Sequence, residues 1–379
     1  MRVLILCAAN PALNPRPSRF IDFFKKKHQV SAMGINSSEI NGVEVINYSA
    51  YKKRSLFGEI ALYFRAFMGK YWHMIYTPNR LEIARFLKRR DFDLIICHDL
   101  VLLPIVLEFK KHAKVIFDAR EFYPGWGKGL RWRLLFARFN DYLCRNFMPE
   151  ADRVITVSKG VRYLYRKNYD IYSDVFYSYP KYVNLNPSIV SDNRVRVIYH
   201  GSATPMRHIE AMIEAIDFCD LRIEINLMLV WQDKKYFKKL FKMVKSRQSK
   251  GKKIRLLKPV PFEDLVSFCN DFDVGLYGLG QNTSNLKVAM PNKFFEYIQS
   301  RLALCVVPHI EMRDFIAKFQ NGVIARSDTP EAIAESLNSF DKKKIMAMKI
   351  KSHSAARELS FEQNTNILQN VLKELFIHK

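Results

Sequence analysis

The regular alternation of short apolar strands with longer helical segments is the feature that most limits how this chain can fold. In the first half the predicted strands are Val3–Cys7, Gln29–Met33, Asp93–Cys97, Lys114–Phe117 and Arg153–Val157. The alternation restarts after residue 193, where the predicted strands are Val195–His200, Ile223–Trp231, Lys253–Leu257, Asp273–Tyr277, Leu302–Val307 and Gly322–Ala325. Strands joined by helical crossovers pair in parallel, with helices on both faces. The pattern predicts an α/β chain with two doubly wound, Rossmann-like domains.

The segments between these strands support the same organisation. Helical patterns are predicted at Ser18–Lys27, Leu81–Arg90, Leu102–His112, Leu130–Asn146, from Lys159 onward, and in a tail at Phe361–Ile377. The stretch "SYPKYVNLNPSIVSDN", residues 178–193, is rich in proline, asparagine and serine and is the predicted linker. With 379 residues the chain is long enough for two domains. We expect them at residues 1–185 and 186–358.

The strongly basic composition limits the possible partners. Lys and Arg number 61 against 37 Asp and Glu, a formal net charge of +24. Such a surplus attracts nucleic acid, anionic lipid or phosphate-bearing substrates, although it can also serve solubility alone. The basic residues are dispersed and no zinc-finger, helix-turn-helix or RNP pattern occurs, so specific nucleic-acid binding is not expected. No apolar run approaches the ~20 residues of a spanning helix, so no transmembrane segment is predicted.

The cysteines and the opening residues bear on the cellular compartment. No CxxC or Cys/His ligand spacing occurs, so neither a zinc site nor a disulfide scaffold is predicted. The opening "MRVLILCAAN" has only a brief apolar stretch and favours a buried first strand over a signal peptide. These features predict a reduced, cytoplasmic protein.

Two stretches of the second half suit a phosphate ligand. In "YHGSATPMRHIEAMIEAI", residues 199–216, Gly201 and Ser202 permit a tight turn and a helix is expected to begin near Pro205. Free amides at that helix start, with Arg207 beside them, would bind a phosphate. The stretch lacks a GxGxxG fingerprint, and a purely structural turn explains it equally well.

The second stretch is "MPNKFFEYIQSRLALCVV", residues 290–307. Pro291 and Asn292 precede Lys293 at a predicted helix start, and Glu296 follows three residues later on the same helix face. One interpretation is an intrahelical Lys–Glu pair on a solvated face. In the other, Lys293 neutralises a diphosphate while Glu296 accepts hydrogen bonds from the vicinal hydroxyls of a ribose.

The ordered set of motifs resembles the glycosyltransferases of the GT-B fold, specifically glycosyltransferase family 4. In the second half the resemblance lies in "HGSATPMRHIEAMIEAI", "VPFEDLVSFCNDFDVGLYGL" and "MPNKFFEYIQSRLALCVV". In the first half it lies in "NPRPSRFIDFFKKKHQVSAMG", "FDLIICHDLVLLP", "VIFDAREFYPGW" and "ADRVITVSKGV". "LSFEQNTNILQNVL", residues 359–372, is similar to the family's closing helix, which typically returns to the first domain. The resemblance implies that residues 359–379 belong with domain 1–185 and that the two domains face one another across a cleft.

The resemblance also implies an activity: a retaining, metal-independent hexosyltransferase without a cofactor that uses a nucleotide-diphosphate sugar. Arg207 and Lys293 fall where the family places cations against the diphosphate, together with Gly201 and Ser202. Glu296 falls on the ribose-binding glutamate of the E-x7-E motif. The residues implied to line the base are Val260, Pro261 and Glu263.

Two positions depart from the family pattern. The first glutamate of E-x7-E is replaced by Val288, so we expect the donor sugar to be held by other residues of that loop; the candidates are Asn285, Lys287, Pro291 and Asn292. "DAREF" carries Arg120 where many members have a histidine, and arginine cannot act as a base. Arg120 could hold an anionic acceptor or a donor phosphate, or it could simply pair with Asp118 or Glu121. These three residues are the predicted catalytic group.

The acceptor is expected on the first domain. The resemblance places Asn10, Arg16, His98 and Asp99 on the acceptor side of the cleft, although a lone histidine there is often structural. The basic amphipathic segment "KGLRWRLLFARFNDYLCRNF", residues 128–147, either packs on the core or docks on an anionic membrane leaflet. Family members often act on lipid-linked or polymeric acceptors. We therefore expect a role in bacterial surface glycan synthesis at the inner face of the inner membrane.

Two further functions remain open from the sequence. A nucleotide-sugar 2-epimerase shares the two-domain architecture but needs acid–base residues around the sugar, and no convincing set is present. A non-catalytic protein of the same fold, binding polyanions or membranes, is the other alternative, because a fold alone does not establish activity.

Overall fold

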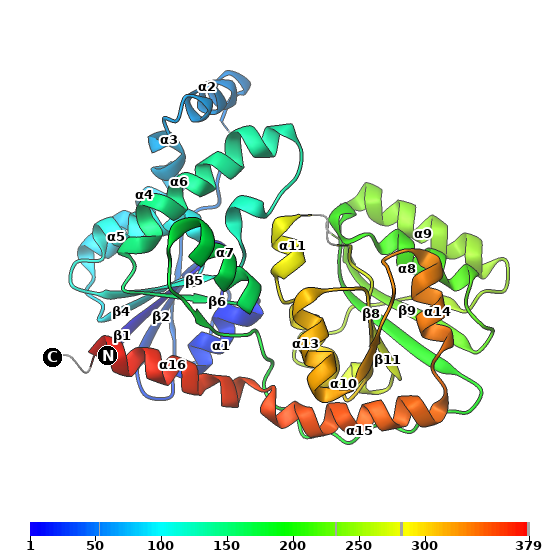
Figure 1. Cartoon of the computed structure of the whole chain (residues 1–379). Helices are drawn as coiled ribbons and strands as arrows, with labels where there is room; N and C mark the ends of the chain where they lie inside the picture. The colour runs from blue at the N-terminus through cyan, green and yellow to red at the C-terminus, as the bar shows by residue number, and fades with distance from the viewer. Residues whose placement is uncertain (53, 232, 281–282, 377–379) are drawn as a thin grey trace. The chain divides into compact units, whose positions relative to one another are not determined.

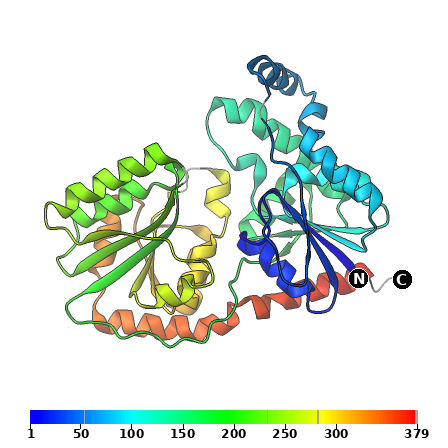
Figure 2. The same ribbon diagram turned by 180° about the vertical axis from the view of Figure 1, so that it is seen from behind.

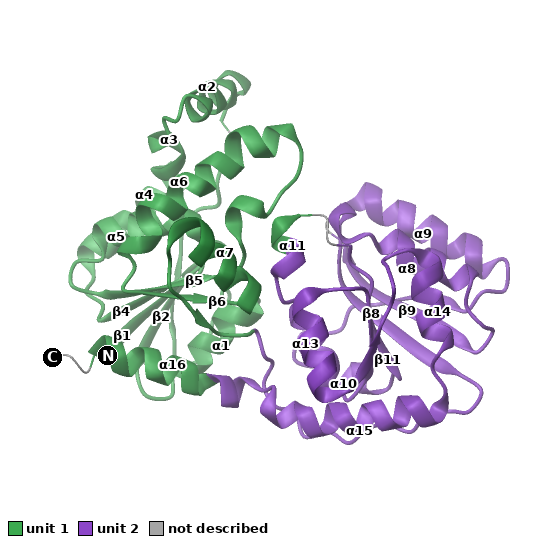
Figure 3. Cartoon of the chain, viewed as in Figure 1, with its two compact units in different colours: residues 1–177, 283–285, 365–379 green, residues 178–282, 286–364 purple. Residues whose placement is uncertain are grey.

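The computed structural model describes residues 1–52, 54–231, 233–280 and 283–376. Its contacts divide the chain into two compact units (Figure 3). Unit 1 comprises residues 1–177, 283–285 and 365–379, and unit 2 comprises residues 178–282 and 286–364. The predicted domain boundary after residue 185 lies eight residues beyond the one given by these contacts.

The sheet of unit 1 consists of parallel strands in the order β3-β2-β1-β4-β5-β6-β7 (Figure 1). The strands are β1 (Arg2–Leu6), β2 (Gln29–Gly34), β3 (Glu44–Asn47), β4 (Leu94–Cys97), β5 (Lys114–Ala119), β6 (Arg153–Thr156) and β7 (Asp174–Val175). Chain order reverses at β1, which pairs with β2 on one side and β4 on the other. Ligands of such sheets bind outside the carboxyl ends of the strands at this reversal.

The helices of unit 1 cover this sheet. They are α1 (Pro15–Phe24), α2 (Leu56–Phe67), α3 (Trp72–Ile75), α4 (Pro78–Arg89), α5 (Leu103–Phe109), α6 (Arg138–Phe147), α7 (Lys159–Tyr169) and the greater part of α16 (Phe361–Phe376). As Figure 2 shows, α1 lies across β1 and β2. Ser158 begins α7 by accepting a hydrogen bond from the Val161 N–H, the cap that serine typically provides.

The sheet of unit 2 is also parallel, in the order β10-β9-β8-β11-β12-β13. The strands are β8 (Val195–Ala203), β9 (Ile223–Trp231), β10 (Ile254–Leu257), β11 (Val274–Tyr277), β12 (Ala303–Val306) and β13 (Gly322–Ile324). Chain order reverses at β8, between β9 and β11. The predicted fold class, an α/β chain with two Rossmann-like sheets, is confirmed.

The helices of unit 2 are mostly short, and three of them are capped by polar side chains. They are α8 (Ile209–Glu214), α9 (Lys234–Gln248), α10 (Leu265–Asn270), α11 (Ser284–Val288), α12 (Asn292–Gln299), α13 (Ile310–Phe319), α14 (Pro330–Asn338) and α15 (Lys342–Glu358); α11 begins with residues of unit 1. Asp233, Thr329 and Asp341 cap α9, α14 and α15. Every residue of α12 except Asn292 is buried, so this helix is enclosed by its neighbours.

Two predicted segments differ from the observed elements. β8 continues to Ala203 because Gly201 and Ser202 pair with β9, so the predicted tight turn after His200 is wrong. The predicted helix from Leu130 is a π-helical segment, Trp132–Ala137, followed by α6. The predicted tail helix is found as α16 over Phe361–Phe376; its last predicted residue, Ile377, lies outside the described residues.

The predicted linker is held against unit 2 by hydrogen bonds. Arg301 is fully buried and donates to the carbonyls of Val183 and Leu185. Lys349, also fully buried, donates to the Ser188 hydroxyl over 2.8 Å. These hydrogen bonds explain why the segment belongs to unit 2, although its amino-acid composition is typical of a linker.

Within the described ranges, none of the helices combines the length and apolar character needed to cross a bilayer. All six cysteines are free thiols, and five of them are buried; the six are Cys7, Cys97, Cys144, Cys219, Cys269 and Cys305.

Candidate functional site

At the carboxyl end of β8 in unit 2 lies an unusual buried lysine, Lys293. Its side chain comes from the first turn of α12 and is only 5% exposed. The Nζ atom has no hydrogen-bond partner among the described residues and lies over the face of the Tyr199 ring, 3.9 Å from the centroid. A buried ammonium group normally has a partner, because desolvation of an unpaired charge is costly.

The surroundings of Lys293 disfavour its charge. Burial, and then the positive charge of Arg207, lower the pKa of Lys293 well below its usual value, and Glu296 only partly offsets this. An anion placed beside the Nζ atom would reverse the effect, since an opposite charge favours the protonated form. The site is therefore suited to an anionic ligand.

Glu296 and His200 lie beside this cation. Both are buried, and the His200 Nε2 atom is 3.5 Å from the Glu296 Oε2 atom. Burial, Lys293 and Arg207 together lower the pKa of His200 well below its usual value, so the imidazole is neutral at pH 7. The interpretation of Lys293 and Glu296 as a pair on a solvated face is wrong, because α12 is enclosed.

Gly201 and Arg207 complete this group, although not through the predicted helix start. A Cβ atom on Gly201 would lie 2.8 Å from the Lys293 Nζ atom, so the glycine makes room for the cation. Arg207 ends a 3₁₀ turn, and α8 begins only at Ile209, later than predicted. Its charge nevertheless acts on Lys293 and His200. Arg207, Lys293 and Glu296 therefore share one neighbourhood, while Ser202 lies in β8.

The other predicted donor residues are more widely distributed. Asn285 is buried and its Oδ1 atom accepts a hydrogen bond of 2.8 Å from the Phe122 N–H, so its amide oxygen has a structural partner. Lys287 is exposed on α11, and Pro291 and Asn292 are half-buried where α12 begins. The three residues predicted to line the base lie in the loop between β10 and α10, with Pro261 and Glu263 exposed and Val260 half-buried.

In unit 1, three of the predicted residues form one buried network at the carboxyl ends of the strands. The Arg16 guanidinium makes two hydrogen bonds of 2.6 Å to the Asp118 carboxylate. The His98 Nδ1 atom lies 2.7 Å from Asp118 Oδ2, while the buried His98 Nε2 atom has no hydrogen-bond partner among the described residues. Burial raises the pKa of Asp118, but the Arg16 charge and the hydrogen bonds outweigh it, and the pKa is lowered.

These contacts change the predicted catalytic group. Asp118 is completely buried and its carboxylate is bonded to Arg16 and His98, so it positions neighbouring groups instead of meeting a ligand. Arg120 pairs with Asp99, not with Asp118, and its Nε atom donates to the His98 carbonyl over 2.9 Å. Asp99 also accepts a hydrogen bond of 2.7 Å from the Ala8 N–H, which fixes the loop after β1.

Asn10 belongs to the same loop, and its side chain makes hydrogen bonds to neighbouring loop residues. Its amide donates to the Asn36 carbonyl and the Ser38 hydroxyl, and its oxygen accepts from the Ala12 N–H. The side chain therefore organises the loop between β1 and α1.

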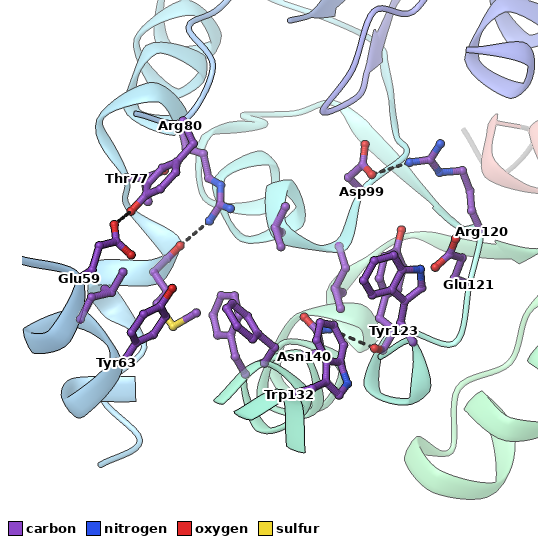
Figure 4. Close-up of a pocket in the computed structure, with 18 residues that line it drawn as sticks. Glu59, Tyr63, Thr77, Arg80, Asp99, Arg120, Glu121, Tyr123, Trp132 and Asn140 are labelled. Carbon is purple, nitrogen blue, oxygen red and sulfur yellow. Dashed lines mark hydrogen bonds and ion pairs between the residues drawn. The ribbon is translucent and has the colours of Figure 1, made fainter. Parts of the chain in front are cut away.

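Asp99, Arg120 and Glu121 line a pocket of about 550 Å³ that lies wholly within unit 1 (Figure 4). Most of its wall is aromatic or aliphatic; the aromatic lining residues are Tyr51, Tyr63, Tyr123, Trp126, Trp132, Phe136 and Phe139. Arg80 and Glu59 face it from α4 and α2. Aromatic faces with a few carboxylate and guanidinium groups suit a ligand that has apolar faces and polar edges.

Several residues of both sites were not predicted. Both Tyr199 and His200 belong to a predicted strand, and alternation along a strand does not reveal that Lys293 lies over the Tyr199 ring or that its charge acts on His200. The pocket aromatics come from two stretches that are far apart in sequence: α2 with the loop before it, and the π-helical segment with the loop before it and α6 after it. The described residues contain no group of three or more His, Cys, Asp or Glu side chains placed to hold a metal ion.

Comparison with known proteins gives a family for part of the chain. Residues 41–179 match the model of glycosyltransferase family 4. No match was found among curated protein sequences.

The fold of the whole chain is that of several solved glycosyltransferase structures. Anabaena HepE, solved in complex with UDP-glucose, superposes with a TM-score of 0.73 at 13% identity, covering 99% of both chains. WaaG, a glycosyltransferase involved in lipopolysaccharide biosynthesis, gives 0.68 at 13% identity, covering 97% of this chain and 99% of WaaG. Trehalose-6-phosphate synthase from Burkholderia multivorans gives 0.67 at 12% identity, covering 99% and 98%. The whole chain thus has the GT-B fold of these glycosyltransferase structures, and its residues 41–179 match the model of glycosyltransferase family 4.

Proposed function

We propose that the protein transfers a hexose from a nucleotide-diphosphate sugar to a glycan or lipid-linked acceptor, with retention of configuration and without a metal ion. The observation that carries this proposal is Lys293, a buried lysine whose Nζ atom lacks a hydrogen-bond partner in the described structure and whose pKa is affected by the nearby Glu296 carboxylate. A diphosphate supplies the missing anion, and a ribose supplies hydroxyl donors for the carboxylate.

In this reaction the bond between the anomeric carbon and the diphosphate oxygen breaks, and a bond to an acceptor hydroxyl oxygen forms on the same face. The diphosphate leaves with the bonding electron pair and accepts the proton of the attacking hydroxyl. Lys293, protonated once the anion is beside it, and Arg207 stabilise the charge on the leaving group. Such cations take the role that a divalent ion has in other transferases.

The pocket of unit 1 is the proposed acceptor site. Its aromatic walls suit the apolar faces of a sugar ring, while Asp99, Glu121 and Arg120 offer partners for hydroxyl or phosphate groups. A guanidinium has five N–H donors, so Arg120 retains donors for a ligand beyond those given to Asp99 and His98. Arg120 binds and orients the acceptor in this proposal and does not act as a base.

The solved structures of similar fold suggest which donor to test first and which cellular role to expect. HepE was solved with UDP-glucose, which makes this the first donor to test. WaaG acts in lipopolysaccharide biosynthesis, which supports a role in bacterial surface glycan synthesis at the cytoplasmic face of the inner membrane. Peripheral membrane binding agrees with the net charge of +24.

Calorimetric titration with UDP, GDP, ADP, CMP and TDP tests the donor site. We expect one nucleoside diphosphate to bind, and Glu296→Ala and Lys293→Met each to weaken its binding by about tenfold or more. Lys351→Met, an exposed lysine on α15, is the matched control and should bind normally. If folded protein binds none of these nucleotides, the proposal is wrong.

Transfer itself is measured by mass spectrometry of lipid and polysaccharide acceptors after incubation with UDP-glucose. Unchanged turnover in EDTA is expected, and NMR of the product should give the donor's anomeric configuration. Loss of turnover in EDTA, restored by Mg²⁺, would contradict metal independence while leaving transfer intact.

A further inference from the structure

Helix α2 has an apolar surface exposed to solvent. Leu56, Phe57, Ile60, Phe64 and Phe67 lie along one side of the helix, and their exposed fractions run from 48% to 83%. The spacing of three and four residues from Phe57 to Phe67 places them in one stripe. A surface helix normally presents its polar side to water, so this stripe indicates a binding surface.

The opposite side of α2 is buried, which fixes the orientation of the stripe. Leu62 is 6% exposed and Ala66 is fully buried. Tyr63 packs edge-on against Phe136 of the π-helical segment, with ring centroids 6.1 Å apart. Figure 1 shows α2 standing out from the body of unit 1 beside this segment. The helix is therefore anchored by one face while its other apolar face remains uncovered.

Cations border the stripe. Arg131 donates to the Tyr63 hydroxyl over 2.7 Å and its guanidinium lies over the Tyr63 ring, which places an exposed cation beside α2. Arg138 lies over the Phe67 ring in the same way. Arg65 and Lys70 are exposed on α2 and just after it.

Acidic side chains are nearly absent around α2, and the one that is present does not belong to the apolar stripe. Residues 54–76 and 122–140 contain a single acidic residue, Glu59. Its carboxylate accepts hydrogen bonds from the Tyr51 hydroxyl and the Arg54 N–H, and it lines the pocket. The outer surface of α2 thus combines exposed apolar side chains with cations.

We propose that this α2 surface, formed by Leu56, Phe57, Ile60, Phe64 and Phe67 with Arg65, Lys70, Arg131 and Arg138, docks on an anionic lipid bilayer. The apolar stripe would enter the boundary between headgroups and acyl chains, and the cations would contact lipid phosphates. A second copy of the chain fits less well, because it would bring the same cations against one another.

The docked helix would also place the pocket at the membrane. Glu59, Leu62 and Tyr63 line the pocket from the inner side of α2, while Ile60 and Phe64 face outward. One helix therefore separates the proposed acceptor site from the bilayer, which favours a lipid-linked acceptor over a soluble polymer. This last point rests on the proposed function, whereas docking itself does not require sugar transfer.

Vesicle flotation tests the docking. We expect the full chain to bind vesicles of phosphatidylcholine with phosphatidylglycerol, and to bind pure phosphatidylcholine at least about tenfold more weakly. The double variant Ile60→Gln/Phe64→Gln should lose about tenfold or more of its binding to the anionic vesicles. Arg65→Gln/Lys70→Gln should weaken anionic binding and reduce its salt dependence.

The controls separate docking from folding and from transfer. Leu221→Gln/Ile350→Gln removes two exposed apolar side chains from unit 2 and should bind vesicles normally. Circular dichroism and nucleotide binding of the Ile60→Gln/Phe64→Gln variant should match those of the unaltered chain. Unchanged vesicle binding by this variant, or a dimer that it converts to monomers, would overturn the proposal, whatever the outcome of the nucleotide titration.

Discussion

Lys293 and Lys349 are both buried lysines of unit 2, but only one has hydrogen-bond partners. Lys349 donates to the Ser188 hydroxyl and the Phe272 carbonyl, whereas the Lys293 Nζ atom has no hydrogen-bond partner in the described part of the chain. The difference predicts opposite effects of the same substitution. A lysine without partners that is retained in the core at a cost to stability is best explained by a ligand.

We expect Lys293→Met to raise the free energy of unfolding by about 1–3 kcal/mol, because it removes a buried group with no hydrogen bonds. Lys349→Met should lower it by a similar amount, since two acceptors lose their donor. Urea denaturation monitored by circular dichroism measures both. Destabilisation by Lys293→Met would mean that its ammonium group is stabilised within the protein.

The buried histidines predict a dependence of stability on pH. Burial lowers the pKa of His98, and burial with the neighbouring cations lowers that of His200, so both stay neutral in the folded state while the unfolded chain takes up protons near pH 6.5. Their contribution is complete above that value and is lost as pH falls. The free energy of unfolding should therefore decline from about pH 7 to pH 5.

His98→Gln should make this decline shallower, because a titrating group is removed while a donor for Asp118 is kept. Urea denaturation across this pH range measures the slope. An exposed histidine, His112→Gln, is the control and should leave the slope unchanged; an equal slope in the His98 variant would contradict the assignment.

At the scale of single elements, the end of β8 is shaped by one glycine. Gly201 has φ +142°, a backbone conformation that side chains rarely adopt, and a Cβ there would meet the Lys293 Nζ atom. Gly251, between α9 and β10, has φ +77° with nothing within 4 Å of a Cβ. The two positions share backbone strain but differ in what a methyl group would touch.

We expect Gly201→Ala to cost about 1–2 kcal/mol of stability and to weaken nucleotide binding, because Lys293 must move. Gly251→Ala should carry only the cost to stability. Urea denaturation and calorimetric titration of both variants separate strain from displacement. Normal nucleotide binding by Gly201→Ala would exclude a role for this close approach.

The elements with strong periodicity were predictable, and those shaped by tertiary contacts were not. Ile223–Trp231 matches β9 residue for residue, since apolar residues alternate at Ile223 and Ile225 and then run without interruption from Leu227 to Trp231. β8 was predicted too short because pairing with β9 outweighs the preference of Gly201 for a turn. Helix α2 was missed because it is apolar on both sides, so its sequence lacks the contrast that marks an amphipathic helix.

The candidate site was predictable where one segment supplies it. Lys293 and Glu296 share α12, and the sequence placed both correctly at a helix start. The ion-pair partner of Arg120 was not predictable. Asp99 follows a neighbouring strand, whereas Asp118 and Glu121 are closer to Arg120 in sequence and seemed the better candidates. The pocket depends on side chains from separate helices, which spacing along the chain does not reveal.

At the scale of the whole molecule, α16 tests how independent the two units are. Leu368 is buried in the part of α16 that belongs to unit 1, and Leu337 is buried on α14 in unit 2. Leu→Ala at either position should cost about 2–5 kcal/mol. If each unit unfolds independently, each substitution should destabilise only the unit that contains it.

Hydrogen exchange followed by mass spectrometry measures this directly. Leu368→Ala should speed exchange in peptides from β4 and β5, and Leu337→Ala in peptides from β11 and β12. Equal acceleration in both units by either variant would mean that the chain unfolds as a single cooperative body.

Neither unit is a continuous stretch of sequence, and this affects the order in which the protein can fold during synthesis. The ribosome delivers residues 1–177 first, yet the helix that supplies the buried Leu368 and Val371 of unit 1 comes after nearly all of unit 2. Unit 1 therefore cannot complete its fold until unit 2 has been synthesised. Premature termination before residue 365 would leave its apolar surface uncovered, and such truncated chains are expected to become substrates for chaperones and proteases.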